Sequence, residues 1–507
     1  MLDRRPPVCF VALTLLLSCL AGPLSGQIRL GQKKELFLDD HLIAARENVR
    51  RVVHPVTKHP QNPVLRPTEP WEGSVAIVFG SVLRDEGKYR MWYLGHTKDG
   101  ARGVAYAESL DGIAWQKPVF DFHRVDGQRT NLLIPAGAKE GGPNALPTYY
   151  ELFGVHKDPA EADPSRRYKL GFLSIERGYR GPREDPFHRG QRRGLGVAAS
   201  PDGIHWRLMD SWATEAICDG ATHWMYDPAR AKYVLYGRTK HMPADVLEAW
   251  KGNEWARRHF WGRAVARVES DDFLRWSHVD PGSGTLVMAP DVKDPPGTEI
   301  YSMNVFPYET VYIGLVQVFH NQPDTCHLDI QLAVSRDSIH FERVGDRSPF
   351  LPVGDVGTWD RFNQSLANNP PLVSGDELRF YYGGRTSRHS PYAGKDTGEP
   401  FGGIGLGTIR RDRFVSLQAS FDGGTILTRP LQLQGKDLYL NAKSDFGSIV
   451  IEALGRDGQT LARSEPLRAD QLRIPVSWSS GSLDGSAPPI QLRVTLKNAQ
   501  LFAIWCE

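Results

Sequence analysis

The segment Ser200-Pro201-Asp202-Gly203-Ile204-His205-Trp206 carries the pattern that decides the fold. Three further segments share its order of Ser, x, Asp, turn and aromatic: 109–115 (SLDGIAW), 270–276 (SDDFLRW) and 335–341 (SRDSIHF). Asp-Gly between apolar runs is typical of a β-hairpin, because glycine adopts the positive φ that such a turn requires. The Ser and Asp side chains can accept hydrogen bonds from turn amides. We therefore expect four structural hairpins.

A second repeat, a short strand around Tyr or Phe, runs in step with the first. It occurs at 87–93 (GKYRMWY), 167–173 (RYKLGFL), 231–237 (AKYVLYG), 310–316 (TVYIGLV) and 376–382 (DELRFYY). The first four copies each precede one hairpin, and the fifth precedes a basic turn. Strand, aromatic strand, small-residue strand and hairpin strand together form a four-stranded blade. The sequence predicts an all-β fold, a five-bladed β-propeller followed by a C-terminal β-sandwich.

The expected domain boundaries follow from the points at which this pattern of repeats begins and ends. Residues 27–420 are predicted to form the propeller, with strands within 35–65 completing the last blade and closing the ring. Residues 244–260 form the one stretch with helical periodicity. Residues 421–507 lack both repeats and alternate apolar and polar residues between Gly/Asp turns, which indicates a separate β-sandwich.

Residues 1–26 have the pattern of an export signal. Arg4 and Arg5 precede an apolar run over 8–20 that is too short to span a bilayer, and Ser25-Gly26 offers a cleavage site. We expect an exported protein, periplasmic or extracellular, with lipoprotein anchoring at Cys19 as a further possibility. No other segment is apolar enough to span a membrane.

The overall charge and the cysteines exclude several classes of partner and site. The net charge of +2 implies no nucleic-acid partner. Of the remaining cysteines, Cys218, Cys326 and Cys506, two could form one bridge, but no pairing is indicated. No cofactor is predicted. A structural cation is the alternative, with His223, His320, His327 and Asp324 as candidate ligands, although they lack a ligand-spaced motif.

Candidate catalytic residues are the acids on the strand that precedes each aromatic strand, because inner strands of a propeller line its central channel. These acids are Glu72, Glu151, Asp219, Glu299 and Asp360. Glycoside cleavage needs two carboxylates, one as acid and one as nucleophile or base. A structural interpretation stays open for each, and for Asp360 a turn cap is an equal alternative.

We choose Asp219 and Glu299 as the catalytic pair, with Glu72 and Glu151 next. Glu299 stands between apolar neighbours, so its pKa should be raised, which suits the general acid. Asp219 should stay ionised and act as base or nucleophile, and Arg238 could steady a carboxylate or a sugar hydroxyl. The predicted substrate-binding residues are Trp71, His223, Trp224, Arg238, Tyr301 and Asp360. Ordinary packing is the more common role for the tryptophans among them, and this alternative stays open.

The Asn62-Pro63-Val64-Leu65 segment, the 87–93 strand and the Ser-x-Asp-Gly-x-x-Trp hairpins resemble those of five-bladed propeller glycoside hydrolases, the invertase–levanase and arabinanase–xylosidase families. By blade position, the resemblance implies acids at Glu72 or Asp39/Asp40, Glu151, Asp219 and Glu299. It implies a carbohydrate substrate and a glycosidase acting on poly- or oligosaccharide. The alternative is a non-catalytic carbohydrate-binding propeller. Two pocket carboxylates about 5–10 Å apart would favour hydrolysis.

Overall fold

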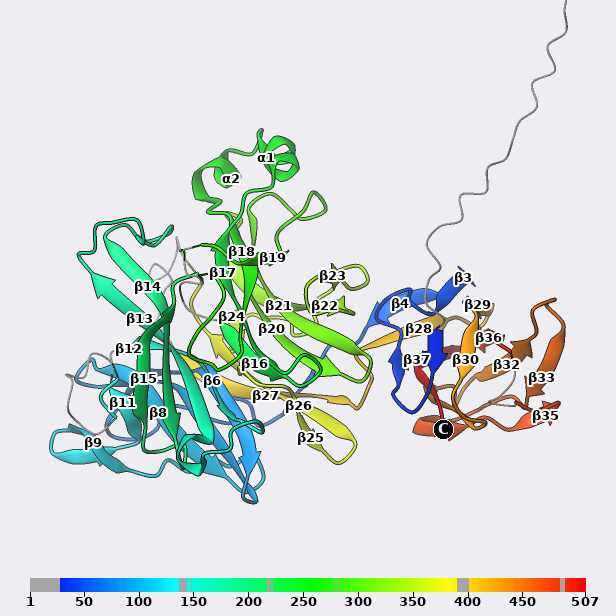
Figure 1. The fold of residues 1–507 in the computed structure, drawn as a ribbon, viewed down its shortest axis with the longest axis horizontal. Coiled ribbons are helices and arrows are strands. Elements are labelled where there is room, and N and C mark those ends of the chain that lie inside the picture. Colours follow the sequence, from blue (N-terminus) through cyan, green and yellow to red (C-terminus); the bar gives the residue numbers. More distant parts are fainter. Residues whose placement is uncertain are drawn as a thin grey trace, which may run out of the picture.

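The computed structural model describes residues 28–135, 144–146, 148–216, 219, 222–278, 280, 282–389, 401–483 and 488–507 (Figure 1). Strands dominate it, and the all-β fold class is confirmed. The predicted helical stretch forms two short helices, α1 (Ala244–Trp250) and α2 (Glu254–His259). A 3-10 turn covers Pro164–Arg166. Among the residues described, no helix has the length and apolar character needed to cross a membrane.

Three antiparallel sheets of four strands each follow one another along the chain. The first contains β12 (Thr148–Lys157), β13 (Tyr168–Arg177), β14 (Gln191–Ser200) and β15 (Arg207–Thr214). The second contains β16 (His223–Asp227), β17 (Lys232–Lys240), β18 (Arg263–Ser270) and β19 (Thr285–Met288). The third contains β20 (Thr298–Tyr308), β21 (Val311–His320), β22 (His327–Ser335) and β23 (Glu342–Arg343). In each, the aromatic strand is second, as the repeat predicts.

Two further antiparallel groups are joined into one larger sheet. One contains β6 (Glu72–Asp85), β7 (Lys88–Thr97), β8 (Arg102–Ser109) and β11 (Leu132–Pro135). The other contains β24 (Phe362–Leu366), β25 (Leu372–Ser374), β26 (Glu377–Arg385) and β27 (Gly402–Arg410), with β5 (Thr57–Lys58) on β27. The groups meet where Gly402 of β27 pairs in parallel with Val75 of β6. A separate two-stranded ribbon contains β9 (Phe120–Val125) and β10 (Gln128–Thr130).

The predicted hairpin caps are confirmed. In the hairpin after β14, the Ser200 hydroxyl accepts the Gly203 N–H at 2.8 Å, and Asp202 Oδ1 accepts the N–H groups of Ile204 and His205, each at 2.8 Å. The aspartate of the other three hairpins likewise accepts two following amides: Asp111, Asp272 and Asp337. The hairpin Gly203 has a φ of +78°, which explains why glycine stands there.

The first strands of these groups contact one another in chain order. β6 contacts β12, β12 contacts β16, and β16 contacts β20. The third sheet then contacts β24 through β22, and β24 contacts β6 again. Buried apolar clusters fill the space between successive sheets, one of them containing Trp92, Tyr168 and Phe172. The order of contacts therefore returns to its starting strand.

The second unit consists of two larger sheets and a small one, at the right of Figure 1. One sheet orders β34 (Asp470–Pro475), β31 (Leu438–Lys443), β37 (Ala499–Cys506), β28 (Val415–Ala419) and β4 (Arg50–Val53), with β2 (Glu35–Leu36) also on β37. The other orders β3 (Ile43–Glu47), β29 (Gly424–Thr428), β36 (Gln491–Lys497), β32 (Ser448–Leu454), β33 (Thr460–Ser464) and β35 (Trp478–Ser480). β1 (Ile28–Leu30) pairs with β30 (Leu431–Leu433). A shared apolar core that includes Leu440, Ile451 and Val494 lies within this unit.

The N-terminal strands differ from the expectation that residues 35–65 close the propeller ring. β1 to β4 pair instead with β30, β37, β29 and β28 of the second unit, and only β5 pairs with a strand of the larger unit. Likewise β28, which ends at Ala419, belongs to the second unit although it precedes the expected boundary at 420. Strand edges of the C-terminal sheets need partners, and the N-terminal strands supply them.

Candidate functional site

A cavity of about 290 Å³ lies where strands of the β6–β11 group, the β20–β23 sheet and the β24–β27 group approach one another. It is lined by Val75, Ile77, Phe79, Leu94, His96, Arg102, Tyr301, Gln317, Leu328, Asn363, Ser365, Arg385, Ser387, His389 and Phe401. The polar members are mostly hydrogen-bond donors, and three aromatic rings, of Phe79, Tyr301 and Phe401, add flat apolar surface. Such a lining suits a ligand that combines hydroxyl or acidic oxygens with apolar faces.

Tyr301, a predicted binding residue, does line this cavity. Its hydroxyl lies 3.1 Å from His389 Nε2, and the two rings meet edge to face with centroids 5.1 Å apart. On its other side, the Arg238 guanidinium lies 3.9 Å from the ring centroid. Tyr301 is thereby held between the cavity and a buried arginine.

Asp219 lies next to that arginine. Arg238 Nη1 donates to Asp219 Oδ2, and Arg193 Nη1 donates to Oδ1 at 2.8 Å. The Asp219 side chain is 19% exposed, and its φ of +73° places the residue in the left-handed region. Two guanidinium groups favour the ionised carboxylate. Arg238, for which the sequence suggested a contact with a carboxylate or a sugar hydroxyl, thus contacts a carboxylate.

Cationic groups surround His96 at the cavity wall. Burial, together with the nearby guanidinium groups of Arg102 and Arg385, lowers the pKa of His96 to about 4. The imidazole is therefore neutral at physiological pH and can both donate and accept a hydrogen bond. No Asp or Glu is among the described residues that line the cavity.

Glu299 lies outside this lining and is fully buried. Its Oε1 accepts from Arg263 Nη1 at 2.9 Å and from Asn321 Nδ2 at 3.2 Å, and its Oε2 accepts the Arg263 backbone N–H at 3.1 Å. These contacts tie β20 to β18 and to the segment after β21. The Glu299 carboxylate is therefore paired with the Arg263 guanidinium in the protein interior.

Glu72 and Trp71 lie at the start of β6, also outside the lining. Glu72 Oε2 accepts the backbone N–H groups of Thr68 and Glu69 at 2.7 and 2.9 Å and forms a salt bridge of 2.5 Å with Lys117. Trp71 Nε1 donates to Asn131 Oδ1 at 3.1 Å. Both residues therefore fix the loop that leads into β6.

Three other predicted binding residues are in packing positions. His223 is 1% exposed, with Nε2 2.7 Å from the Val305 carbonyl oxygen, and burial lowers its pKa to about 4. Trp224 donates to the Gly154 carbonyl at 3.1 Å and packs against Phe273. The carboxylate of Asp360 accepts from Lys58 at 2.7 Å and from the Tyr382 hydroxyl at 3.0 Å.

Glu151 lies in β12, but its side chain is outside the described residues, as is Cys218. Cys326 and Cys506 are buried in different units, on the hairpin after β21 and on β37.

Sequence reasoning searched the first strand of each group for acids. It named Arg238 and His320 among the bases of the second strands, but it missed His96 and Arg385. His96, Arg238, His320 and Arg385 stand at or near the ends of β7, β17, β21 and β26, one to four residues after the aromatic repeat. Two of them, His96 and Arg385, line the cavity. The recurrence of a basic residue after each aromatic strand is the signal that could have found them.

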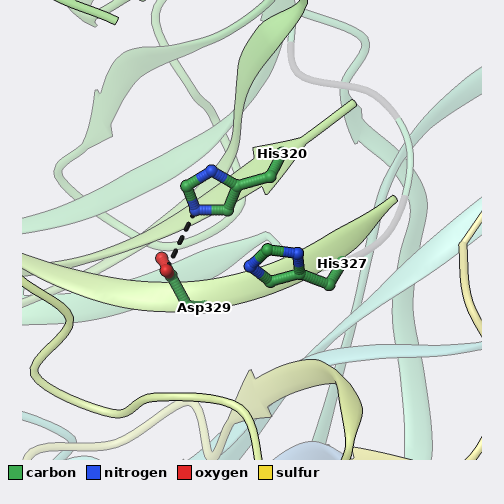
Figure 2. A group of neighbouring side chains, drawn as sticks. All are labelled: His320, His327 and Asp329. Atoms are coloured by element: carbon green, nitrogen blue, oxygen red, sulfur yellow. Dashed lines mark hydrogen bonds and ion pairs between the residues drawn. The ribbon is translucent and has the colours of Figure 1, made fainter. Parts of the chain in front are cut away.

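The candidate cation ligands separate into two groups. His320 and His327 come together with Asp329, and the three donor atoms lie within 4.8 Å of one another (Figure 2). Burial and the neighbouring His320 lower the pKa of His327 to about 4. His223 belongs to another strand group, and Asp324 lies exposed in the turn between β21 and β22. Neither is part of the cluster.

Comparisons with known proteins give structural neighbours only. No protein-family model matches the sequence. No curated protein matches it. Similar solved structures include a glycosyl hydrolase from Bacteroides ovatus, at 16% identity and a TM-score of 0.44, covering 75% of this chain and 98% of that one. Another is a glycoside hydrolase family 43 arabinoxylan arabinofuranohydrolase from Bacillus subtilis, at 10% identity and a TM-score of 0.35, covering 89% and 98%.

A thermostable family-43 glycoside hydrolase is similar at 12% identity and a TM-score of 0.42, covering 69% of this chain and 95% of that one. The structural neighbours thus include several glycoside hydrolases, members of family 43 among them. At these identities and TM-scores, the similarity assigns neither substrate nor activity to this chain.

Proposed function

We propose that the five strand groups are five blades of one propeller and that the second unit is a β-sandwich that includes the N-terminal strands. The cyclic order of contacts from β6 through β24 and back to β6 supports the propeller. Two sheets that share one apolar core support the sandwich. In this arrangement the propeller covers about 57–410, and the sandwich covers 28–53 with 415–507.

The protein is a glycosidase-like protein that binds a poly- or oligosaccharide in the cavity beside Tyr301. The observation that carries this proposal is the cavity itself, with nitrogen donors and aromatic rings contributed by three different strand groups. Sugars present hydroxyl oxygens at their edges and C–H groups on their faces, so they need both kinds of wall. A phenol that is fixed by His389 and Arg238 provides such a rigid contact.

Asp219 is the carboxylate best placed to act on such a ligand. It is part-exposed, it is adjacent to the cavity through Arg238 and Tyr301, and two guanidinium groups hold it ionised. An ionised carboxylate is suited to serve as base or nucleophile in glycoside hydrolysis. The second carboxylate of the reaction is not among the described lining residues, and Glu151 is the first candidate to test for it.

The experiment is a screen of the purified protein against a panel of polysaccharides, followed by variants on the substrate that is cleaved. Asp219→Asn should lower turnover by roughly two orders of magnitude or more. Asp210→Asn, a change of the same kind on β15, is the matched control and should retain activity. A fully active Asp219→Asn variant would contradict the assignment.

A second candidate function is non-catalytic carbohydrate binding. It is favoured by one observation, the lack of Asp or Glu among the described lining residues. In that case the polysaccharide screen gives no products, while calorimetry or a gel-retardation assay detects binding. Tyr301→Ala should then abolish retention, and Asp219→Asn should leave it nearly unchanged.

Export of the mature chain is part of the proposal. The basic and apolar residues at 1–26 support it. Fractionation of expressing cells with N-terminal sequencing of the product tests both cleavage near residue 26 and the alternative of a lipid-modified Cys19.

A further inference from the structure

The His320, His327 and Asp329 side chains form a cluster on one face of the β21–β22 hairpin, as Figure 2 shows. His320 is the last residue of β21 and pairs directly with His327, the first residue of β22. Asp329 follows two residues later, opposite Val318. Residues that are opposite each other, or two apart on a strand, point to the same side of a sheet. The ladder itself therefore brings the three donors together.

The three donor atoms lie nearly as close together as the ligands of a bound zinc ion would. His320 Nε2 lies 2.9 Å from Asp329 Oδ2, and the two imidazole rings stack with centroids 4.5 Å apart. A tetrahedral zinc ion with ligands at about 2.0–2.1 Å would place its donors roughly 3.4 Å apart. Since all three donor atoms already lie within 4.8 Å of one another, small side-chain rotations suffice.

We propose that His320, His327 and Asp329 bind one zinc-type divalent transition-metal ion, with the fourth position left to water.

The donor set selects this class of metal. Two imidazole nitrogens and one carboxylate suit zinc and its neighbours in the first transition row. Calcium and magnesium prefer sites made of oxygens only. His320 is 19% exposed and His327 is also part-exposed, which gives the ion a path from solvent.

The surroundings hold the ligands in place. Gln331 Nε2 donates to Asp329 Oδ1 at 3.4 Å, and Arg343 donates to the Gln331 side-chain oxygen. The turn after His320 is closed by the Gln322 N–H and the Thr325 hydroxyl, which both donate to the His320 carbonyl, at 2.9 and 3.2 Å. Partners that orient metal ligands in this way raise affinity.

The ion would brace the strands that form one wall of the cavity. Gln317 and Leu328 line the cavity and lie on the same two strands as the ligands. Their side chains point to the opposite face, because Leu328 pairs with Phe319, one residue away from the His320–His327 pair. The metal site is therefore separate from the cavity, and its existence does not depend on the proposed saccharide function.

The test uses the full purified chain, stripped with a chelator and then titrated with Zn²⁺ in competition with a chromophoric chelator. We expect one equivalent to bind, and Co²⁺ should give the visible absorption of a tetrahedral site. His327→Ala and Asp329→Asn should each weaken Zn²⁺ binding by at least about 100-fold, since even the loss of an outer partner costs 10- to 100-fold. Asp329→Asn keeps the side-chain shape, so it carries the test if His327→Ala does not fold.

The matched control is His340→Ala. His340 also contacts an aspartate, with Nδ1 2.6 Å from Asp337 Oδ2, but its side chain is 86% exposed and it is not part of the three-donor cluster. This variant should bind Zn²⁺ as the parent does. Parent binding no tighter than that of His327→Ala, or equal affinity in the parent and Asp329→Asn, would overturn the proposal.

Discussion

The Tyr381 hydroxyl on β26 donates to the Gly112 carbonyl oxygen in the first Ser-x-Asp hairpin, at 2.7 Å, across 269 residues of chain. The same relationship recurs between neighbouring sheets. Trp92 donates to the Gly203 carbonyl at 2.8 Å, and the Tyr236 hydroxyl donates to the Ser338 carbonyl at 2.9 Å. In each case, an aromatic side chain on the aromatic strand of one group donates a hydrogen bond to a backbone carbonyl in the hairpin turn of a neighbouring group. The Tyr381–Gly112 contact joins the β24–β27 group to the β6–β11 group.

Tyr381→Phe should therefore destabilise the larger unit. The change removes one buried hydrogen bond and leaves the Gly112 carbonyl without its phenol donor, which should cost about 1–2 kcal/mol of unfolding free energy. Urea denaturation followed by tryptophan fluorescence measures it. Tyr226→Phe, at a part-exposed tyrosine that packs on Tyr233, is the control and should change stability little. Equal stability of both variants would mean that the contact contributes nothing to the stability of the larger unit.

The repeats were sufficient to predict the strand groups, because each hairpin is specified locally. The side chains of Ser200 and Asp202 accept the backbone N–H groups of their own turn, including that of Gly203. A segment of seven residues therefore suffices to specify the hairpin. The partner of an N-terminal strand is not specified in this way. β3 and β4 pair with β29 and β28, some 370 residues later in the chain, and an edge strand of either unit would have met the same hydrogen-bonding need.

The candidate site was predictable only in part. Tyr301 lines the cavity, and Arg238 contacts both its ring and the Asp219 carboxylate, so three residues named from the sequence lie next to one another. Glu299 satisfied the same sequence criterion but points to Arg263 and Asn321. The side chain of an acid on a strand points either toward a cavity or toward a neighbouring sheet. Which direction it takes depends on whether a basic or amide partner, distant in sequence, lies on that sheet. His96 and Arg385 were missed because the strand-by-strand search for pocket residues considered only acids.

The hairpin aspartates should make stability depend on acid pH. At Asp202, burial acts to raise the pKa, but hydrogen bonds from the His205 amide and ring, the Ile204 amide and Ser200 outweigh it and lower the pKa to about 2. Because the pKa of Asp202 is lower in the folded than in the unfolded chain, the unfolded chain binds more protons at acid pH. The stabilisation that Asp202 gives to the folded state is therefore complete above about pH 5 and is lost as the pH falls toward 2. Asp272 behaves alike, with a pKa of about 2.

Asp202→Asn should therefore reduce stability at pH 7, by less than about 1 kcal/mol because the side chain is 42% exposed and solvent screens it. The gap between parent and variant should narrow as the pH is lowered from 5 to 2.5. Urea midpoints measured across that range check this. A gap that stays constant with pH would show that the ionised form of Asp202 is not what stabilises the turn.

Removing the N-terminal strands should unfold the second unit. A chain that begins at residue 54 lacks β1 to β4, so β28, β29 and β30 each lose a pairing partner. We expect rapid proteolysis within 415–507 or loss of soluble protein. A chain that begins at residue 28 keeps all these pairs and should resist the protease. Equal resistance of the two chains would show that the second unit is stable without its N-terminal strands.

Glu299→Gln separates a structural role of this carboxylate from a catalytic one. The substitution leaves the Arg263 guanidinium buried without its charge partner, which typically costs 3–5 kcal/mol. The unfolding free energy should fall by about that amount. Glu254→Gln, in the exposed pair with Arg258 on α2, is the matched control and should change stability by less than about 0.5 kcal/mol. If Glu299→Gln instead kept full stability and lost turnover on a cleaved polysaccharide, Glu299 would be the general acid that its sequence context predicts.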